Sequence, residues 1–140
     1  MKLFISENID KSIQGYVIIP IVYGEFDLTK IPDNSATEIV AIDAIDSIKY
    51  DKIKTFISTI ITKMRIGCNL YLGGTDIYAV SRHIIDGTNS LEAINTELLN
   101  KTGAYSLKFI LELLKDSGVR INSATFKGDN YEISAIRPKN

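Results

Sequence analysis

Cysteine and histidine are almost absent from this sequence, which narrows the chemistry open to it. The 140 residues contain one cysteine, Cys68, and one histidine, His83. A single cysteine forms no internal disulfide, and one thiol with one imidazole supplies too few ligands for a structural zinc site. We therefore expect neither a disulfide-bonded scaffold nor a bound metal.

The sequence also lacks an excess of charge of either sign and any long hydrophobic run. Lys and Arg number 16, Asp and Glu number 17, and the net charge is −1. Bulk charge therefore favours neither nucleic acid nor an anionic membrane as a partner. No apolar run reaches the roughly 18 residues of a membrane span, and residues 1–5 are too short for a signal-peptide core. We expect a cytoplasmic protein.

The composition is that of an ordinary globular protein, with 45% hydrophobic and 24% charged residues. The length fits a single domain over residues 1–140, large enough to bury a core. Ile, Asn and Lys are abundant, which is typical of an AT-rich genome such as that of a virus or phage. In that case the cytoplasm is the host's.

Short apolar and β-branched runs predict strands, and apolar residues at three- and four-residue spacing predict helices. The predicted strands are residues 2–6, 15–22, 38–42 and 69–72, a brief third strand near 25–27, and a hairpin of 120–126 with 131–136. The predicted helices are residues 53–64, 77–85, 90–99 and 107–115. We expect Gly67 to cap the helix of residues 53–64. We expect Gly73 and Gly74 to end the strand of residues 69–72.

Strands that alternate with helices indicate an α/β fold with a three-layer, Rossmann-like sheet. The sheet should be mostly parallel, with the C-terminal antiparallel hairpin at its edge. In such sheets ligands bind beyond the carboxyl ends of the strands. The polar segments that follow the predicted strands are therefore the candidate sites.

Two of these segments, residues 43–46 and 73–76, contain acids or glycines whose role can be interpreted in two ways. Asp43 and Asp46, three residues apart, would share one face of a helical turn, where one could serve as a catalytic base. They could equally be acids that stabilise a helix amino end. Gly73, Gly74, Thr75 and Asp76 could let a substrate or anion approach a helix amino end, or simply form a tight turn with an N-cap.

Five segments follow one another along the chain with recognisable patterns. They are residues 15–20 (GYVIIP), the acidic segment with Asp27-Leu28, Ile31–Ala36 and Glu38-Ile39, and residues 64–70 (MRIGCNL), 75–77 (TDI) and 110–119 (ILELLKDSGV). In this order they resemble compact class I S-adenosylmethionine (SAM)-dependent methyltransferases, and the second segment is similar to the family's D-L-x-x-L-P-F-x-D-N-S-V-D-E-I.

The resemblance implies SAM as cofactor and a small-molecule or sugar-type methyl acceptor. It assigns cofactor binding to Ser6, Glu7, Asn8, Asp27 and Leu28, catalysis to Asp43 and Asp46, and substrate binding to Gly73, Gly74, Thr75 and Asp76. In this role the Asp27 carboxylate would accept a hydrogen bond from the exocyclic amine of adenine. The alternative is that Asp27 is a solvated acid at a strand end.

The sequence departs from the family where the cofactor should be held. Residues 5–8 (Ile-Ser-Glu-Asn) lack the family's glycine-rich turn, Pro20 stands where an acid would hold the ribose, and residues 42–47 carry no histidine base. One hypothesis is therefore a methyltransferase with an altered cofactor site. The alternative is a non-catalytic binding or assembly module, for instance a homo-oligomer. A third reading is a site for another nucleotide or small anion at residues 73–76.

Overall fold

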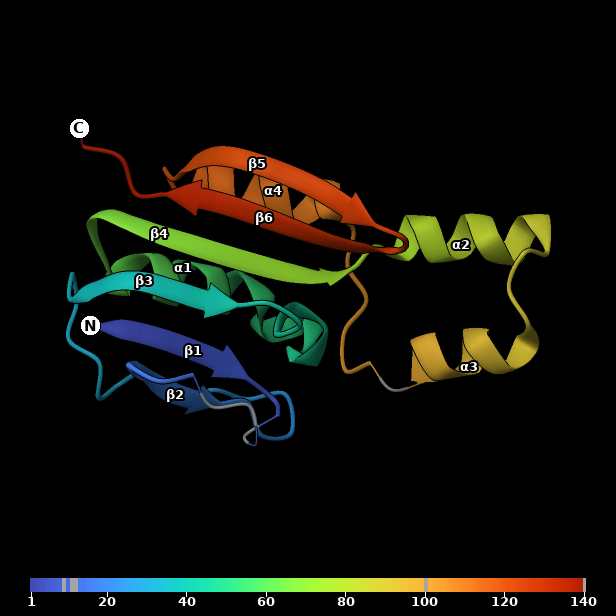
Figure 1. Ribbon diagram of the computed structural model, residues 1–140, viewed down its shortest axis with the longest axis horizontal. Helices are drawn as coiled ribbons and strands as arrows, with labels where there is room; N and C mark the ends of the chain where they lie inside the picture. The colour runs from blue at the N-terminus through green and yellow to red at the C-terminus, as the bar shows by residue number, and fades with distance from the viewer. Residues whose placement is uncertain (9, 11–12, 100, 140) are drawn as a thin grey trace.

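The chain folds around a six-stranded sheet, seen in a computed structural model that describes residues 1–8, 10, 13–99 and 101–139. Across the sheet the strand order is β2-β1-β3-β4-β6-β5 (Figure 1). The pairs β1–β2, β1–β3 and β3–β4 are parallel, whereas β6 is antiparallel to both β4 and β5. The strands are β1 (Lys2–Ser6), β2 (Tyr16–Pro20), β3 (Ala36–Ala41), β4 (Met64–Thr75), β5 (Arg120–Lys127) and β6 (Asn130–Ile136).

In the described ranges, four α-helices and two short 3₁₀ helices connect these strands. They are η1 (Ile45–Ser47), η2 (Tyr50–Lys52), α1 (Ile53–Lys63), α2 (Ile77–Asp86), α3 (Leu91–Leu99) and α4 (Leu107–Asp116). The predicted α/β fold, with a mostly parallel sheet and a C-terminal hairpin, is confirmed. No helix in the described part of the chain is both long enough and apolar enough to cross a membrane.

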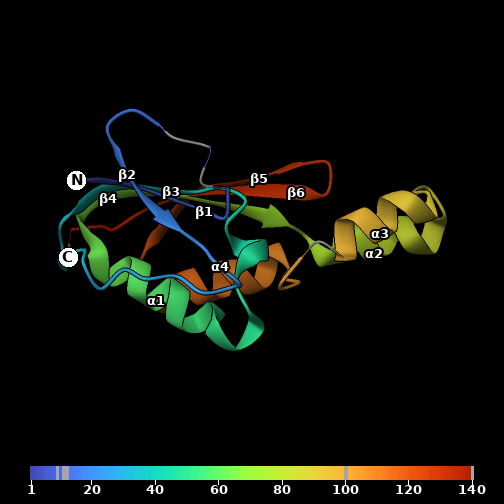
Figure 2. The ribbon, with the colours of Figure 1, turned by 90° about the horizontal axis from the view of Figure 1, so that it is seen from below.

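The hydrophobic core lies between one face of the sheet and the helices α1 and α4. Alternate strand residues point into it, as the pleat of a strand requires. The sheet contributes Leu3, Ile5, Ile39, Ala41, Leu70, Leu72, Ile133 and Ala135, and the helices contribute Phe56, Ile57, Ile60, Ile110 and Leu114. Figure 2 shows α1 and α4 side by side beneath the sheet, with α2 and α3 beyond its end.

The opposite face of the sheet carries a row of larger side chains that are adjacent in register. Ile18, Phe4, Val40 and Tyr71 stand on neighbouring strands, and all except Phe4 are only partly buried. Among the described residues no helix lies over this face (Figure 2). The helical layer is therefore on one face, where the sequence predicted layers on both.

Two local predictions of secondary structure are wrong. The third strand near residues 25–27 does not form: Val22 and Glu25 close a tight turn with two backbone hydrogen bonds. The chain after this turn packs on α1, where the Phe26 and Phe56 rings meet edge to face with their centroids 4.8 Å apart. Gly67 does not cap α1, because the helix ends at Lys63 and Gly67 lies inside β4 with φ +83.

Phe56→Ala tests how far the fold depends on this contact. Phe56 is fully buried, so its truncation leaves a cavity between α1 and the segment that carries Phe26. We expect the free energy of unfolding to fall by about 3–5 kcal/mol in urea titrations. Phe126→Ala is the control, since Phe126 is 52% exposed and its loss should cost no more than about 0.5 kcal/mol.

Candidate functional site

A hollow lies where the sheet reverses its strand order. From β1 the chain crosses to β2 on one side, whereas β3 and its successor β4 lie on the other side. In open α/β sheets this switch point is the usual ligand site, outside the carboxyl ends of the strands. Here the hollow has a volume of about 350 Å³ and is lined by Ser6, Glu7, Asn8 and Asp43. We call it the switch-point hollow.

Side-chain hydrogen bonds shape the β1 side of this hollow. The Ser6 hydroxyl accepts from the Asn8 N–H at 3.0 Å, which turns the chain as β1 ends. The Glu7 carboxylate accepts from the Ser47 hydroxyl at 2.8 Å, which ties the turn to η1. The structure thus brings the three predicted cofactor residues after β1 into one place, beside the predicted catalytic Asp43.

Asp43 and Asp46 do not share a cleft. Asp43 is exposed, lines the switch-point hollow and has φ +68, a conformation that Asp adopts more readily than most residues. Asp46 is 7% exposed, and its carboxylate accepts from the Thr75 N–H at 3.1 Å and contacts the Lys101 ammonium at 3.0 Å. Asp43 therefore lines a hollow, whereas Asp46 holds neighbouring segments together.

Gly73 and Gly74 belong to β4 and do not form a loop. Both are buried and paired with β6. A Cβ on Gly74 would lie 3.0 Å from the Tyr131 hydroxyl and 3.1 Å from the Asp46 carboxylate, and one on Gly73 would lie 3.0 Å from the Tyr131 carbonyl oxygen. These contacts occupy the space beside the two glycines. The prediction that Gly73-Gly74 ends the strand is wrong, because the pairing continues through Thr75.

Asp76 holds two helices at once. One carboxylate oxygen accepts from the Ala79 N–H at 3.1 Å and so caps α2, as the sequence predicted. The other accepts from the Leu107 N–H at 2.9 Å in the first turn of α4. With 4% of its surface exposed, this acid is structural: two helix amino ends stabilise its charge.

A second hollow, absent from the sequence prediction, opens beside the end of β4. It has a volume of about 380 Å³ and is lined by Thr75, Thr96, Glu97, Lys101, Asp129 and Asn130. Its lining comes from the end of β4, from α3, from the segment after α3, and from the turn between β5 and β6 with the first residue of β6. We call it the polar hollow. Of the predicted substrate residues only Thr75 lines it, and no sequence pattern could join it to residues so distant in the chain.

Two consecutive residues of η1 connect the hollows. Asp46 contacts Thr75 and Lys101 of the polar hollow, and Ser47 donates to Glu7 of the switch-point hollow. The Glu97 Oε2 atom in the polar hollow is shielded from solvent and has no hydrogen-bond partner among the described residues. A carboxylate oxygen of this kind can accept a hydrogen bond from a bound hydroxyl.

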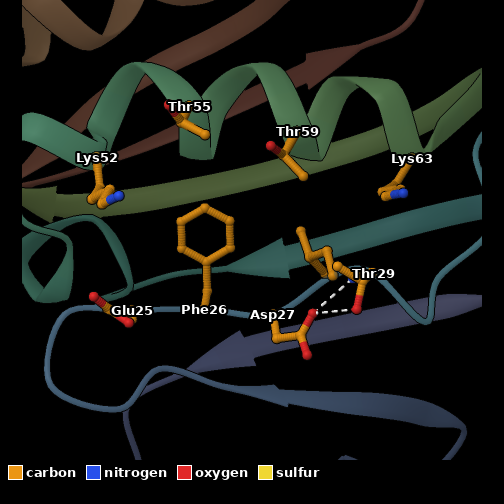
Figure 3. A pocket seen from close by; sticks show the side chains of 9 residues that line it. Glu25, Phe26, Asp27, Thr29, Lys52, Thr55, Thr59 and Lys63 are labelled. Atoms are coloured by element: carbon orange, nitrogen blue, oxygen red, sulfur yellow. Dashed lines mark hydrogen bonds between the residues drawn. The ribbon is translucent and has the colours of Figure 1, made fainter.

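Asp27 and Leu28 lie in a different place from the other predicted cofactor residues. Leu28 is 3% exposed in the core, and the Asp27 carboxylate accepts from both the N–H and the hydroxyl of Thr29, which lowers its pKa. Both residues line a groove of about 320 Å³ between this segment and α1, and Figure 3 shows Asp27 there with its hydrogen bonds to Thr29. Lys52 and Lys63 stand at its ends, with Thr55 and Thr59 between them.

Two buried tyrosines, Tyr105 and Tyr131, lie near Asp46 but line neither the switch-point hollow nor the polar hollow. Burial raises the pKa of Tyr105 to about 12, and its hydroxyl donates to the Ile48 carbonyl at 2.6 Å. Burial also raises the pKa of Tyr131, whose hydroxyl lies 3.0 Å from the position that a Cβ on Gly74 would take. Both therefore stay protonated at neutral pH. Among the described residues no group of three or more His, Cys, Asp or Glu side chains is placed to bind a metal.

Comparison with solved structures gives the fold. One neighbour is a SAM-dependent methyltransferase from Archaeoglobus fulgidus, at TM-score 0.63 and 11% identity over 96% of this chain and 85% of that one. A putative methyltransferase from Bacillus halodurans matches at TM-score 0.64 and 9% identity over 99% and 84%. An O-methyltransferase family 2 protein from Planctomyces limnophilus, in complex with apigenin, matches at TM-score 0.58 and 15% identity over 79% and 33%.

The chain thus has the fold of class I SAM-dependent methyltransferases, as the sequence resemblance indicated. At these identities the likeness describes the fold alone. The sequence matches no protein-family model and no curated protein. The chain also spans only a third of the Planctomyces limnophilus protein.

Asp76→Ala tests the structural role of this acid. The substitution leaves the Ala79 and Leu107 N–H groups without their acceptor. Since one cap is worth about 0.5–2 kcal/mol, we expect the free energy of unfolding to fall by about 1–4 kcal/mol in urea titrations. The exposed Asp116→Ala is the control. Unchanged stability of Asp76→Ala would return this residue to the list of site candidates.

Gly74→Ala tests why the glycine is needed. The new methyl group would press on the Tyr131 hydroxyl and the Asp46 carboxylate. We expect a loss of about 1–3 kcal/mol in thermal or urea unfolding. In the Tyr131→Phe background the same change should cost less, because one of the two contacts is gone. An equal cost in both backgrounds would contradict this account.

Proposed function

We propose that this chain binds SAM in the switch-point hollow and methylates a small-molecule or sugar-type acceptor held in the polar hollow. The observation that carries the proposal is the position of the first hollow. It lies at the switch point of a sheet with the class I methyltransferase fold, and residues from both adjoining strand ends line it.

The residues of the switch-point hollow fit SAM in charge. SAM carries a positive sulfonium and an α-ammonium, and Glu7 and Asp43 offer two carboxylates around the hollow. Its volume of about 350 Å³ falls in the usual range for small-molecule sites. When bound, SAM supplies a methyl group on a positively charged sulfur. Glu7 and Asp43 would hold its cationic groups, while Ser47 fixes the Glu7 carboxylate.

The polar hollow fits an acceptor with hydroxyl groups. Thr75, Thr96 and Asn130 offer hydroxyl and amide groups, and the Glu97 Oε2 atom offers an unused acceptor. Glu97 could take the proton of an acceptor hydroxyl as that oxygen becomes nucleophilic. The apigenin complex of the Planctomyces limnophilus neighbour is consistent with a small-molecule acceptor. In this proposal the protein acts in the cytoplasm, the host's if its origin is viral, without a nucleic-acid partner.

One observation favours a second candidate function, a methyltransferase-fold module that binds or assembles without catalysis. The turn after β1 is closed by the hydrogen bond from the Asn8 N–H to the Ser6 hydroxyl, and it contains no glycine that would let the backbone approach a cofactor closely. None of the described residues between β1 and β2 is helical, so these residues present no helix amino end to the hollow. On this account the hollow retains its shape and has lost its cofactor.

Calorimetric titration with SAM and with its demethylated product separates the two functions. We expect a measurable heat with at least one ligand. Glu7→Gln or Asp43→Asn should weaken binding by about tenfold or more, since a hydrogen bond to a charged group is worth about 1.5–3 kcal/mol. The exposed Asp116→Asn is the matched control and should bind normally. No heat with either ligand, at millimolar concentration and with the fold intact, would favour the non-catalytic module.

A further inference from the structure

The helices α2 and α3 form an arm that stands apart from the rest of the molecule. Figures 1 and 2 both place them beyond the carboxyl end of β4, away from α1, α4 and the sheet. The arm is tied to the body at its base, where Asp76 caps α2 and His83 contacts Asp129 at 2.8 Å. We define the arm as residues 77–99.

The arm carries apolar side chains that this chain alone leaves in water. The buried residues of α2 are Ala79 and Val80, both near its base, and none of the residues of α3 is buried. The exposed apolar residues are Tyr78 (64%), Ile84 (41%), Ile85 (85%), Leu91 (76%) and Leu99 (76%). Such a cluster on one projecting element marks an interaction surface rather than scattered surface residues.

A nine-residue helix without a buried side chain has little to hold it together. Isolated helices shorter than about 12–15 residues are marginal in water, and most helices in proteins depend on packing of their apolar face. The sequence of α3 nevertheless places Leu91, Ile94 and Leu98 at helical spacing, and the Ser90 hydroxyl caps it by accepting from the Ala93 N–H at 3.1 Å. Ile94 and Leu98 are partly buried, whereas Leu91 and Leu99 at the two ends of the helix remain exposed.

We propose that the arm packs against the same arm of a second copy of this chain, to form an antiparallel four-helix contact around a two-fold axis. Closed two-fold dimers are the commonest homo-oligomers, and their interface uses one patch twice. A helical hairpin with apolar residues on both limbs satisfies this condition, because α2 of one copy can face α3 of the other. Four helices then enclose the side chains that two leave exposed.

Area and charge both favour a second copy as the occupant. The five exposed apolar side chains would bury on the order of 60–120 Å² each, which sums over two copies to roughly 600–1,200 Å² and at its upper end exceeds the roughly 1,000 Å² that a specific interface needs. Arg82 on α2 and Glu92 on α3 are exposed, opposite in charge and without an ion-pair partner among the described residues. In the proposed two-fold contact each Arg82 would meet Glu92 of the other copy.

Light scattering during gel filtration of the full chain, over a wide concentration range, tests the proposal. We expect a dimer at micromolar concentration. Ile85→Lys should raise the dissociation constant at least tenfold, because the change buries a charge in the dimer and disturbs nothing in the monomer. Phe126→Lys is the matched control: it adds the same charge at an exposed apolar residue outside the arm and should leave the dimer intact.

A mixing experiment shows whether the contact runs between copies. Arg82→Glu and Glu92→Arg should each weaken self-association through like charges. Mixed together, the two variants should form a heterodimer more stable than either homodimer, since both charge pairs are then complementary. A monomer at all concentrations would overturn the proposal, as would an assembly that Ile85→Lys leaves intact. Hydrogen exchange of residues 77–99 provides a further check: slow exchange in a monomer would also overturn it.

Discussion

The Asp76 carboxylate holds the functional end of this molecule together. It is buried where β4 ends, and it accepts backbone hydrogen bonds from the first turns of both α2 and α4. A buried charge without a cation is costly unless hydrogen bonds replace its water, and two helix amino ends provide them here. The backbone N–H of Asp76 also donates to Asp129 at 2.8 Å, in the turn between β5 and β6. One residue thus fixes the arm, the last helix and the hairpin relative to the central strand.

Most of the fold could be predicted from the sequence because its signals are local. Residues that are close in the chain set the alternating burial of β6 and the apolar stripe of α1. They also set the amino-terminal caps of α2 and α4. The failures have tertiary causes. The segment at Phe26 has strand-like residues but packs on Phe56 of α1, so it never joins the sheet. Gly67 is typical of a helix cap, yet its pairing neighbours in the sheet draw it into β4.

The candidate site was only partly predictable, for a related reason. The rule that ligands bind at the carboxyl ends of strands selected Ser6–Asn8 and Asp43, and these residues line one hollow because the rule depends on topology. The roles of Asp46 and Gly74 depended on what lies opposite them, and their opposite residues are Lys101 and Tyr131. The sequence pattern of a glycine near an acid is the same whether the space beside the glycine holds a ligand or a neighbouring side chain. The polar hollow draws on three distant segments and leaves no sequence signal at all.

The pairing of β4 also has a consequence for how this protein is made. Residue 69 of β4 pairs on one side with residue 38 and on the other with residue 136. Chains emerge from the ribosome amino end first, so the first partner is present early, whereas the second is synthesised only after the arm and α4. Throughout the synthesis of the arm and α4, the future centre of the sheet is therefore an open edge, the feature that most invites pairing with another chain. The hazard for this fold is greatest in the interval before β6 appears.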